Sequence, residues 1–223
     1  GFAFDVEVHQ EKDSLVCGDE TAGVEAAKAG PSVSRVPFAG PSGSWKKPTL
    51  ANGVETYVNL PRIILFGGEA YADLGTESSK GTKLLSLTGK INNAGFIEVP
   101  MGTSVGEIIF DMGGGIPGRK KFKAVQIGGL SGGCLSSEHL NTRIDYDALS
   151  KVGAVMGCGS MIVMDESTCM VDMARHFMEF WQDEIRGQCP SCQVEAKRML
   201  EILRRICQGK GRQGDIELLE HLS

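Results

Sequence analysis

The sequence lacks a long hydrophobic run, an excess of positive charge and a dense set of cysteines, and each absence excludes a class of protein. No stretch approaches the roughly 20 apolar residues that cross a bilayer, so we expect no direct membrane span. A net charge of −5 disfavours a nucleic-acid binder, which usually presents a basic face. The four histidines are too dispersed to form a metal site with one another.

The seven cysteines are an odd number scattered over 223 residues. A disulfide framework in a small secreted domain is denser and even-numbered, and no secretory signal is visible. We therefore expect a reducing, cytoplasmic setting in which most cysteines are small buried apolar residues. Only Cys189 and Cys192 have the spacing of metal ligands.

The first third of the chain predicts a strand, a short helix, a long loop and a second helix. Residues 2–8 alternate apolar and acidic positions, which is typical of a half-buried strand. "DETAGVEAAK" opens a short helix, residues 31–48 are rich in Pro, Ser and Gly, and "VETYVNLPRIILF" predicts a helix that Gly67 and Gly68 end. Because the chain begins inside the strand-like run, we expect further sequence upstream.

The middle of the chain changes to short β runs. "TKLLSLTG", "GFIEVPMG", a helix-like "SVGEIIFDMGGG" and "KFKAVQIGG" give β, β, α and β in order, and "NNAG" predicts a hairpin turn. Strands packed on one helix indicate a small α+β domain of the β-grasp type. The glycine clusters at 112–118 and 128–133 match neither the dinucleotide fingerprint nor the P-loop, so we expect turns at the edges of this domain.

The last third predicts helices. Ser167 is a candidate N-cap for "TCMVDMARHFMEFWQDE", whose apolar positions fall on one stripe. A second apolar stripe follows "CPSC", Gly209 is its expected C′ residue, and "GDIELLEHLS" starts a third helix. We expect a helical bundle that is cut off at its C-terminal edge.

Two short stretches carry candidate chemistry. The thiols of Cys189 and Cys192 suit zinc, an iron–sulfur cluster, a redox disulfide or no ligand, although two thiols alone cannot close a tetrahedral site. Their helical flanks do not match the βαβ setting of a thioredoxin-like pair. "VCGDETA" places Asp19 and Glu20 at a strand-to-helix turn, where they either face a hydrogen-bonding cofactor or simply favour the helix N-terminus.

Seven motifs together resemble the FMN- and NADH-binding flavoprotein subunit of respiratory complex I. They resemble equally its relatives in NAD(P)-linked, electron-bifurcating hydrogenases and formate dehydrogenases. In chain order they are "FDVEVH", "VCGDETA", "VPFAG", "PTLANGVET", "GRKKFKAVQIGGLSGG", "GSMIVMDESTCMVDMARHFMEF" and "GQCPSCQVEAKRMLEIL". The resemblance covers essentially the whole chain.

The resemblance implies a multidomain α+β fold. Residues 1–76 would be the C-terminal part of an α/β flavin domain, 77–160 a ubiquitin-like β-grasp domain of the soluble-ligand-binding type, and 161–223 a truncated helical bundle with a [4Fe–4S] cluster. The family's Gly-rich FMN loop would precede this chain and its C-terminal end would follow it. We therefore expect this segment alone to be inactive.

The resemblance also carries residue roles over to this chain. Six positions match the cofactor pocket: Gly18, Asp19 and Glu20 in the stretch at the flavin and nicotinamide, Phe38 in the loop against the NADH adenine, and Asn52 and Gly53 in the flavin-contacting turn. Two match the second and third cysteines of the cluster motif Cys-Gly-x-Cys-x-Pro-Cys: Cys189 and Cys192.

The chain departs from the family at two places. "EKDSL" replaces a small Gly-Ala-Gly segment and brings two acids and a lysine to the flavin loop. Arg186 stands where the first cluster cysteine belongs, and arginine cannot ligate iron because it stays protonated. The family's fourth cysteine would lie beyond Ser223. A three-cysteine cluster, a non-cysteine fourth ligand and no cluster at all therefore stay open.

The resemblance predicts an NAD(P)H-oxidising electron-transfer subunit that passes hydride to FMN and single electrons to iron–sulfur clusters. It would be cytoplasmic, either free or attached to the inner face of the membrane through its partners. Those partners would be a thioredoxin-like [2Fe–2S] subunit and a larger iron–sulfur or hydrogenase subunit. Two alternatives stay open: a redox-inactive paralogue acting as a scaffold or binding subunit, and a zinc-binding helical module at Cys189 and Cys192.

Overall fold

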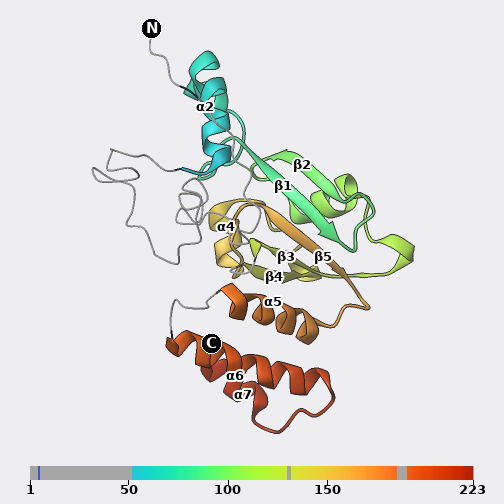
Figure 1. Ribbon diagram of the computed structural model, residues 1–223. Coiled ribbons are helices and arrows are strands. Elements are labelled where there is room, and N and C mark those ends of the chain that lie inside the picture. The colour runs from blue at the N-terminus through green and yellow to red at the C-terminus, as the bar shows by residue number, and fades with distance from the viewer. Residues whose placement is uncertain (1–4, 6–51, 130–131, 185–189, 223) are drawn as a thin grey trace. The chain divides into compact units, whose positions relative to one another are not determined.

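The computed structural model describes Asp5 and residues 52–129, 132–184 and 190–222. The chain divides into two compact units, Gly1–Val163 and Met164–Ser223 (Figure 1). The strand expected over residues 2–8 (apart from Asp5) and the helix expected after Asp19 lie outside the described residues. Among the described helices, none is long and apolar enough to cross a bilayer. The division into three domains stays a prediction.

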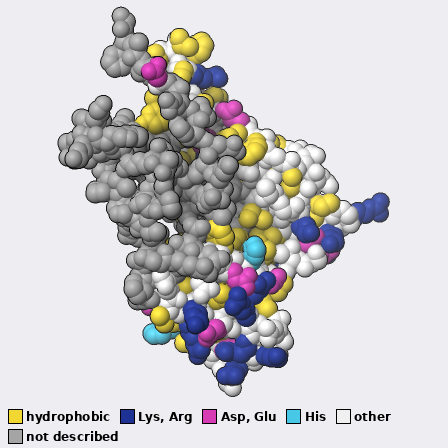
Figure 2. Space-filling model, viewed as in Figure 1, with side chains coloured by type: hydrophobic (Ala, Val, Ile, Leu, Met, Phe, Trp, Pro, Cys, Tyr) yellow, Lys and Arg dark blue, Asp and Glu magenta, His cyan; other side chains and the backbone are white. Residues whose placement is uncertain are grey.

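Helix α2, Val54–Phe66, is the first described element of the first unit and was predicted by its sequence. It ends at Gly67, whose φ of 89° is a conformation that glycine adopts readily. Helix α3, Gly68–Ala72, follows directly. No residue of α2 is buried, and Figure 2 shows hydrophobic side chains at the surface over this helix.

Strands β1, Thr82–Gly89, and β2, Gly95–Pro100, form the predicted antiparallel hairpin. The predicted turn "NNAG" is only partly right, because Gly95 already belongs to β2 and the connection between the strands runs over residues 90–94. Alternate residues of β1 are buried, as the pleat of a strand requires. The hairpin was therefore readable from local sequence.

Five strands form one mixed sheet in the order β2-β1-β5-β3-β4. Strand β5, Ser160–Asp165, pairs parallel with β1, while β3, Phe122–Ile127, pairs antiparallel with β4, Gly133–Ser136. The sequence analysis predicted neither β4 nor β5. A central strand is covered on both faces, so the apolar residues of β5 do not alternate and give no period-2 signal.

The predicted helical segment between β2 and β3 is a π-helix, Glu107–Met112 (η2). It is preceded by a reciprocal pair: Ser104 Oγ accepts from Glu107 N at 3.2 Å, and the Glu107 carboxylate accepts from Ser104 N at 2.9 Å. Its two isoleucines lie in the main hydrophobic core with residues of all five strands; the buried members from these elements include Leu85, Leu87, Val99, Ile108, Ile109, Val125, Ile127, Leu135, Met161 and Val163.

The glycine-rich stretch after β3 packs against the protein's own backbone. A Cβ atom at Gly128 would lie 2.1 Å from the carbonyl oxygen of Val155, and one at Gly132 would lie 1.7 Å from that of Ile127. Any larger residue would therefore push these segments apart. Close packing within the first unit explains these glycines without a phosphate ligand.

Asp145 is a buried carboxylate at the N-cap of the short helix α4, Tyr146–Lys151. Its Oδ1 accepts from two backbone N–H groups of the first helical turn at 3.0 and 3.1 Å. Its Oδ2 accepts from the hydroxyl of Thr76 and from Ser78 Oγ at 3.1 Å. These hydrogen bonds, that of Thr76 foremost, lower the pKa of Asp145 to about 2. The residue joins two segments of the chain and stays ionised.

The second unit contains helices α5, Met170–Glu184, α6, Pro190–Cys207, and α7, Asp215–Leu222, which agree with the helical segments predicted for this region. The N-cap assignment of Ser167 is wrong, because α5 begins three residues later. Ser167 instead donates its backbone N–H to Asp165 Oδ1 at 3.0 Å, within a turn that follows β5.

Candidate cofactor and cluster sites

The structure describes three of the predicted site residues: Asn52, Gly53 and Cys192. The other five lie outside the described residues, so their roles stay predictions: Gly18, Asp19, Glu20, Phe38 and Cys189. The first two described residues belong to the first unit and the third to the second unit.

Asn52 and Gly53 form an exposed turn that leads into α2. Gly53 is the N-cap residue, with φ −59° and ψ 146°, and its carbonyl accepts from Tyr57 N at 3.3 Å. A Cβ atom at Gly53 would meet only Thr56 Oγ1, at 3.9 Å. A residue with a side chain would therefore fit at this position. The first N–H groups of a helix have no intrahelical acceptor, so this turn offers hydrogen-bond donors to a ligand.

An ion pair fixes this turn to the sheet. Lys83 on β1 is only 6% exposed, and its Nζ contacts the carboxylate of Glu55 in the first turn of α2. The same carboxylate accepts from Leu84 N at 2.7 Å. Because α2 buries none of its residues, these polar contacts and not an apolar core set where the helix begins.

Cys192 lies in the first turn of α6 and continues the buried stripe of that helix. Ala196, Leu200 and Leu203 are buried further along, and their spacing places Cys192 on the same face. Cys192 is disulfide-bonded.

The expectation of buried cysteines is wrong for the four free cysteines that the structure describes. All four are exposed: Cys134, Cys158, Cys169 and Cys207. The reason is their position, since they lie on the edge strand β4, in a turn, just before α5 and at the end of α6.

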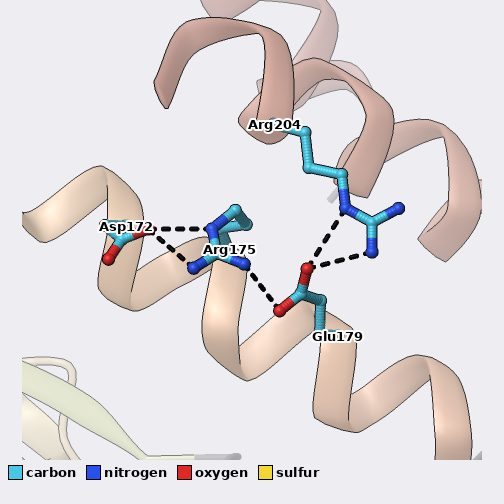
Figure 3. A network of polar contacts seen from close by, with 4 residues as sticks. All are labelled: Asp172, Arg175, Glu179 and Arg204. Carbon is cyan, nitrogen blue, oxygen red and sulfur yellow. Dashed lines mark hydrogen bonds and ion pairs between the residues drawn. The ribbon is translucent and has the colours of Figure 1, made fainter. Parts of the chain in front are cut away.

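A polar network joins α5 to α6 (Figure 3). Arg175 Nε donates to Asp172 Oδ1 at 2.8 Å, and its Nη1 donates to Glu179 Oε2 at 2.6 Å. Arg204 on α6 donates to Glu179 Oε1 through Nε at 3.1 Å and Nη2 at 2.9 Å. The guanidinium of Arg204, followed by that of Arg175, lowers the pKa of Glu179. Glu179 is thus an ionised link between the two helices.

A second link joins α6 to α7. Asp215, 5% exposed, contacts the guanidinium of Arg205 and accepts from Arg212 N at 2.7 Å. The hydrogen bond from Arg205 is the main cause of the lowered pKa of Asp215. The helix that carries Cys192 is therefore held on both sides by ion pairs.

Comparison with known proteins gives the context of these helices. Residues 172–223 match the family model described as "NADH-ubiquinone oxidoreductase-F iron-sulfur binding region". The whole chain is 48% identical to the NADP-reducing hydrogenase subunit HndC of Solidesulfovibrio fructosivorans and covers 46% of that protein. It is 37% identical to the NADH-quinone oxidoreductase F subunit of Escherichia coli (strain K12) and covers 50% of it.

Over its whole length this chain is thus similar to NADH-quinone oxidoreductase F subunits. The resemblance drawn from the motifs is thereby confirmed, and the chain spans about half the length of these relatives. Its structure also matches the crystal structure of an NAD+-reducing [NiFe]-hydrogenase in the air-oxidised state. The TM-score is 0.77 at 28% identity, over 93% of this chain and 35% of that chain.

The described residues of this chain do not by themselves fit a [4Fe–4S] cluster. Within them, no group of three or more His, Cys, Asp or Glu side chains is placed to hold a metal ion. Cys192 is the only predicted ligand that they include. Iron–sulfur clusters are held by thiolates, and Cys192 can supply one of them.

Sequence reasoning missed the residues that hold these positions in place. The acids and the arginine of α5 follow one another at i+3 and i+4, a spacing that predicts pairing within a helix. The pair between Glu55 and Lys83 spans 28 positions, and no local pattern signals it. Only the fold brings those two residues together.

Proposed function

We propose that the full-length protein containing this chain is an NAD(P)H-oxidising electron-transfer subunit. It takes hydride from NADH or NADPH onto FMN and sends single electrons to the iron–sulfur clusters of its assembly. The observation that carries the proposal is similarity over the whole chain to a subunit named NADP-reducing and to subunits named NADH-quinone oxidoreductase. The match of residues 172–223 to an iron–sulfur binding region supports it.

The cofactor contacts are proposed residue by residue. Asn52 and Gly53 would hold the flavin at the N-terminus of α2, where the turn is exposed and has room. Gly18, Asp19 and Glu20 would line the flavin and nicotinamide, and Phe38 would lie against the adenine. When bound, FMN converts a two-electron donor into single-electron steps. The protein's part is to orient the nicotinamide and to keep water out.

The proposal for the iron–sulfur cluster concerns two ligand residues. Cys189 and Cys192 would be the ligands that this chain supplies to a [4Fe–4S] cluster. Arg186 occupies the position of a third, and a protonated guanidinium is no ligand.

The fold proposal keeps three domains with limits at 76 and 160. Two observations support a ubiquitin-like β-grasp domain in the middle: the order β2-β1-β5-β3-β4 and the parallel pairing of β1 with β5 at its centre. The flanking segments would be the end of a flavin domain and the helical bundle of the cluster.

The partners and location follow from the same proposal. The relatives are named as subunits, so this protein would act within a multi-subunit assembly. Its partners would be a thioredoxin-like [2Fe–2S] subunit and a larger iron–sulfur or hydrogenase subunit. The assembly would be cytoplasmic, and this segment alone would be inactive.

One observation favours a second function. Arg186 at a ligand position, together with the acids of "EKDSL" in the flavin loop, would suit a paralogue that has lost redox activity. Such a protein would serve as a scaffold or binding subunit in the same kind of assembly.

Anaerobic purification of the full-length protein with its partners distinguishes the two functions. Flavin, iron and sulfide are measured, and NADH is added while flavin absorbance is followed. The enzyme predicts bound flavin that NADH bleaches. If the purified protein contains neither flavin nor iron, the enzyme proposal is refuted and the scaffold is supported. Zinc in place of iron would support the zinc module.

A further inference from the structure

We propose that four basic residues at the start of β3, Arg119, Lys120, Lys121 and Lys123, here called the basic turn, dock an acidic surface of another protein. The exposed apolar side chains beside it would form the centre of that contact. The proposal concerns the first unit and does not depend on flavin or cluster binding.

The charge of the basic turn is concentrated and unusual for this chain. Four of the 23 lysine and arginine residues lie within five positions, in a chain of net charge −5. All four are exposed. Within the described part of the chain, the side chains of Arg119 and Lys121 make no hydrogen bond or ion pair. Their charges are therefore available to a partner. The nearest preceding acidic residue in the sequence is Asp111, which is also exposed.

An exposed aromatic side chain contacts the strand at which the basic turn ends. Phe110 and Met112 are 42% and 41% exposed. Phe110 meets Phe122, the residue inside the basic turn, edge to face with ring centroids 6.1 Å apart. Exposed aromatic and methionine side chains next to arginine match the composition of protein–protein interfaces.

The backbone at Arg119 adds an independent observation. Its φ of 59° makes it the sole described non-glycine residue with a positive φ, and Gly118 before it has a φ of 69°. A non-glycine residue in this conformation is strained. Glycine would relieve the strain, so the presence of arginine here points to a use for its side chain.

The kind of partner follows from charge. A nucleic acid or an anionic membrane carries negative charge over an area larger than the basic turn, so the rest of a chain with net charge −5 would repel it. An acidic patch on a protein can pair locally with the basic turn and enclose Phe110 and Met112. An acidic protein surface is therefore the occupant that we propose.

Zero-length coupling tests the contact directly. A carbodiimide joins a lysine amine to a carboxylate that it touches, so the assembly isolated with full-length protein is treated and its peptides are sequenced by mass spectrometry. We expect links from Lys120, Lys121 or Lys123 to Asp or Glu of another polypeptide. The proposal would be overturned if the basic turn is linked only to its own chain. It would also be overturned if the basic turn forms no more links to other polypeptides than the exposed Lys80 and Lys151 do.

A pair of variants separates docking from stability. Arg119→Gly with Lys121→Gln should leave the melting temperature unchanged or higher, because glycine removes the strain. It should weaken capture of the linked partner about threefold to tenfold at low salt, and less at high salt. Lys80→Gln with Lys151→Gln removes the same charge and should not weaken capture. Equal effects of both pairs, or capture of nucleic acid that nuclease abolishes, would refute the proposal.

Discussion

At the residue scale, Asp145 shows how a buried carboxylate is kept ionised by hydrogen bonds. Hydroxyl and backbone donors surround it at 5% exposure. Its pKa falls from 3.8 to about 2 because the charged form accepts these hydrogen bonds. The residue thereby ties α4 to the turn that contains Thr76.

Asp145→Ala should lower the free energy of unfolding of the full-length protein by about 1–3 kcal/mol at pH 7, because it removes an N-cap and leaves buried donors unpaired. A carboxylate with a lowered pKa stabilises the fold fully above about pH 4 and loses this effect as pH falls toward 2. The difference between wild type and variant should shrink over that range, measured by denaturant unfolding. The exposed Asp147→Ala is the control, and a pH-independent difference would contradict the assignment.

At the element scale, α2 is attached to the sheet by charge more than by apolar contact. Its carboxylate Glu55 neutralises the buried ammonium of Lys83 and accepts from the β1 backbone. Removing the glutamate leaves a buried cation unpaired, which is worse than removing both partners. The turn at Asn52 and Gly53 depends on this attachment.

Glu55→Ala should therefore destabilise the start of α2 by about 1–3 kcal/mol. Hydrogen exchange of residues 54–60 should quicken, while that of β5 stays slow. The double variant Glu55→Ala with Lys83→Met should recover part of the loss. Additive effects of the two changes would show that the pair does not act as a unit.

The α5–α6 contact makes a second prediction at this scale. Glu179→Gln should lower the melting temperature by a few degrees, because it loses charge-assisted bonds from two arginines. Since the pKa of Glu179 is lowered, this difference should fade only at pH values below the ordinary range of a glutamate. Glu201→Gln breaks a pair within α6 alone and should have little effect. A similar loss in both variants would argue against the link.

At the scale of the whole molecule, the prediction concerns the proposed cluster ligands. If Arg186 replaces a ligand, Arg186→Cys should raise the iron and sulfide content of the anaerobically purified full-length protein. A thiolate would then be available where a guanidinium stood. Arg198→Cys, at an exposed position of α6, adds a thiol elsewhere and should not. Unchanged iron in Arg186→Cys would mean that the position is not a lost ligand.

Patterns within short stretches of sequence predicted the elements whose formation depends on neighbouring residues. Gly67 ended α2, alternation gave β1 and β2, and the stripe of α6 gave its buried face. Of the candidate site, Asn52 and Gly53 were found by their motif and lie in an open turn. Strand β5 was missed because it is central, and α4 was missed because it has only six residues.

The sequence by itself determined the resemblance to these subunits, the longer helices and the first hairpin, because each depends on short motifs or regular spacing. The tertiary structure decided which strand lies at the centre of the sheet, which charges are buried and which cysteines are exposed. These are long-range matters. Lys83 meets Glu55, and Glu179 meets Arg204, only after the chain has folded, since such pairings depend on packing between segments and leave no period in the sequence.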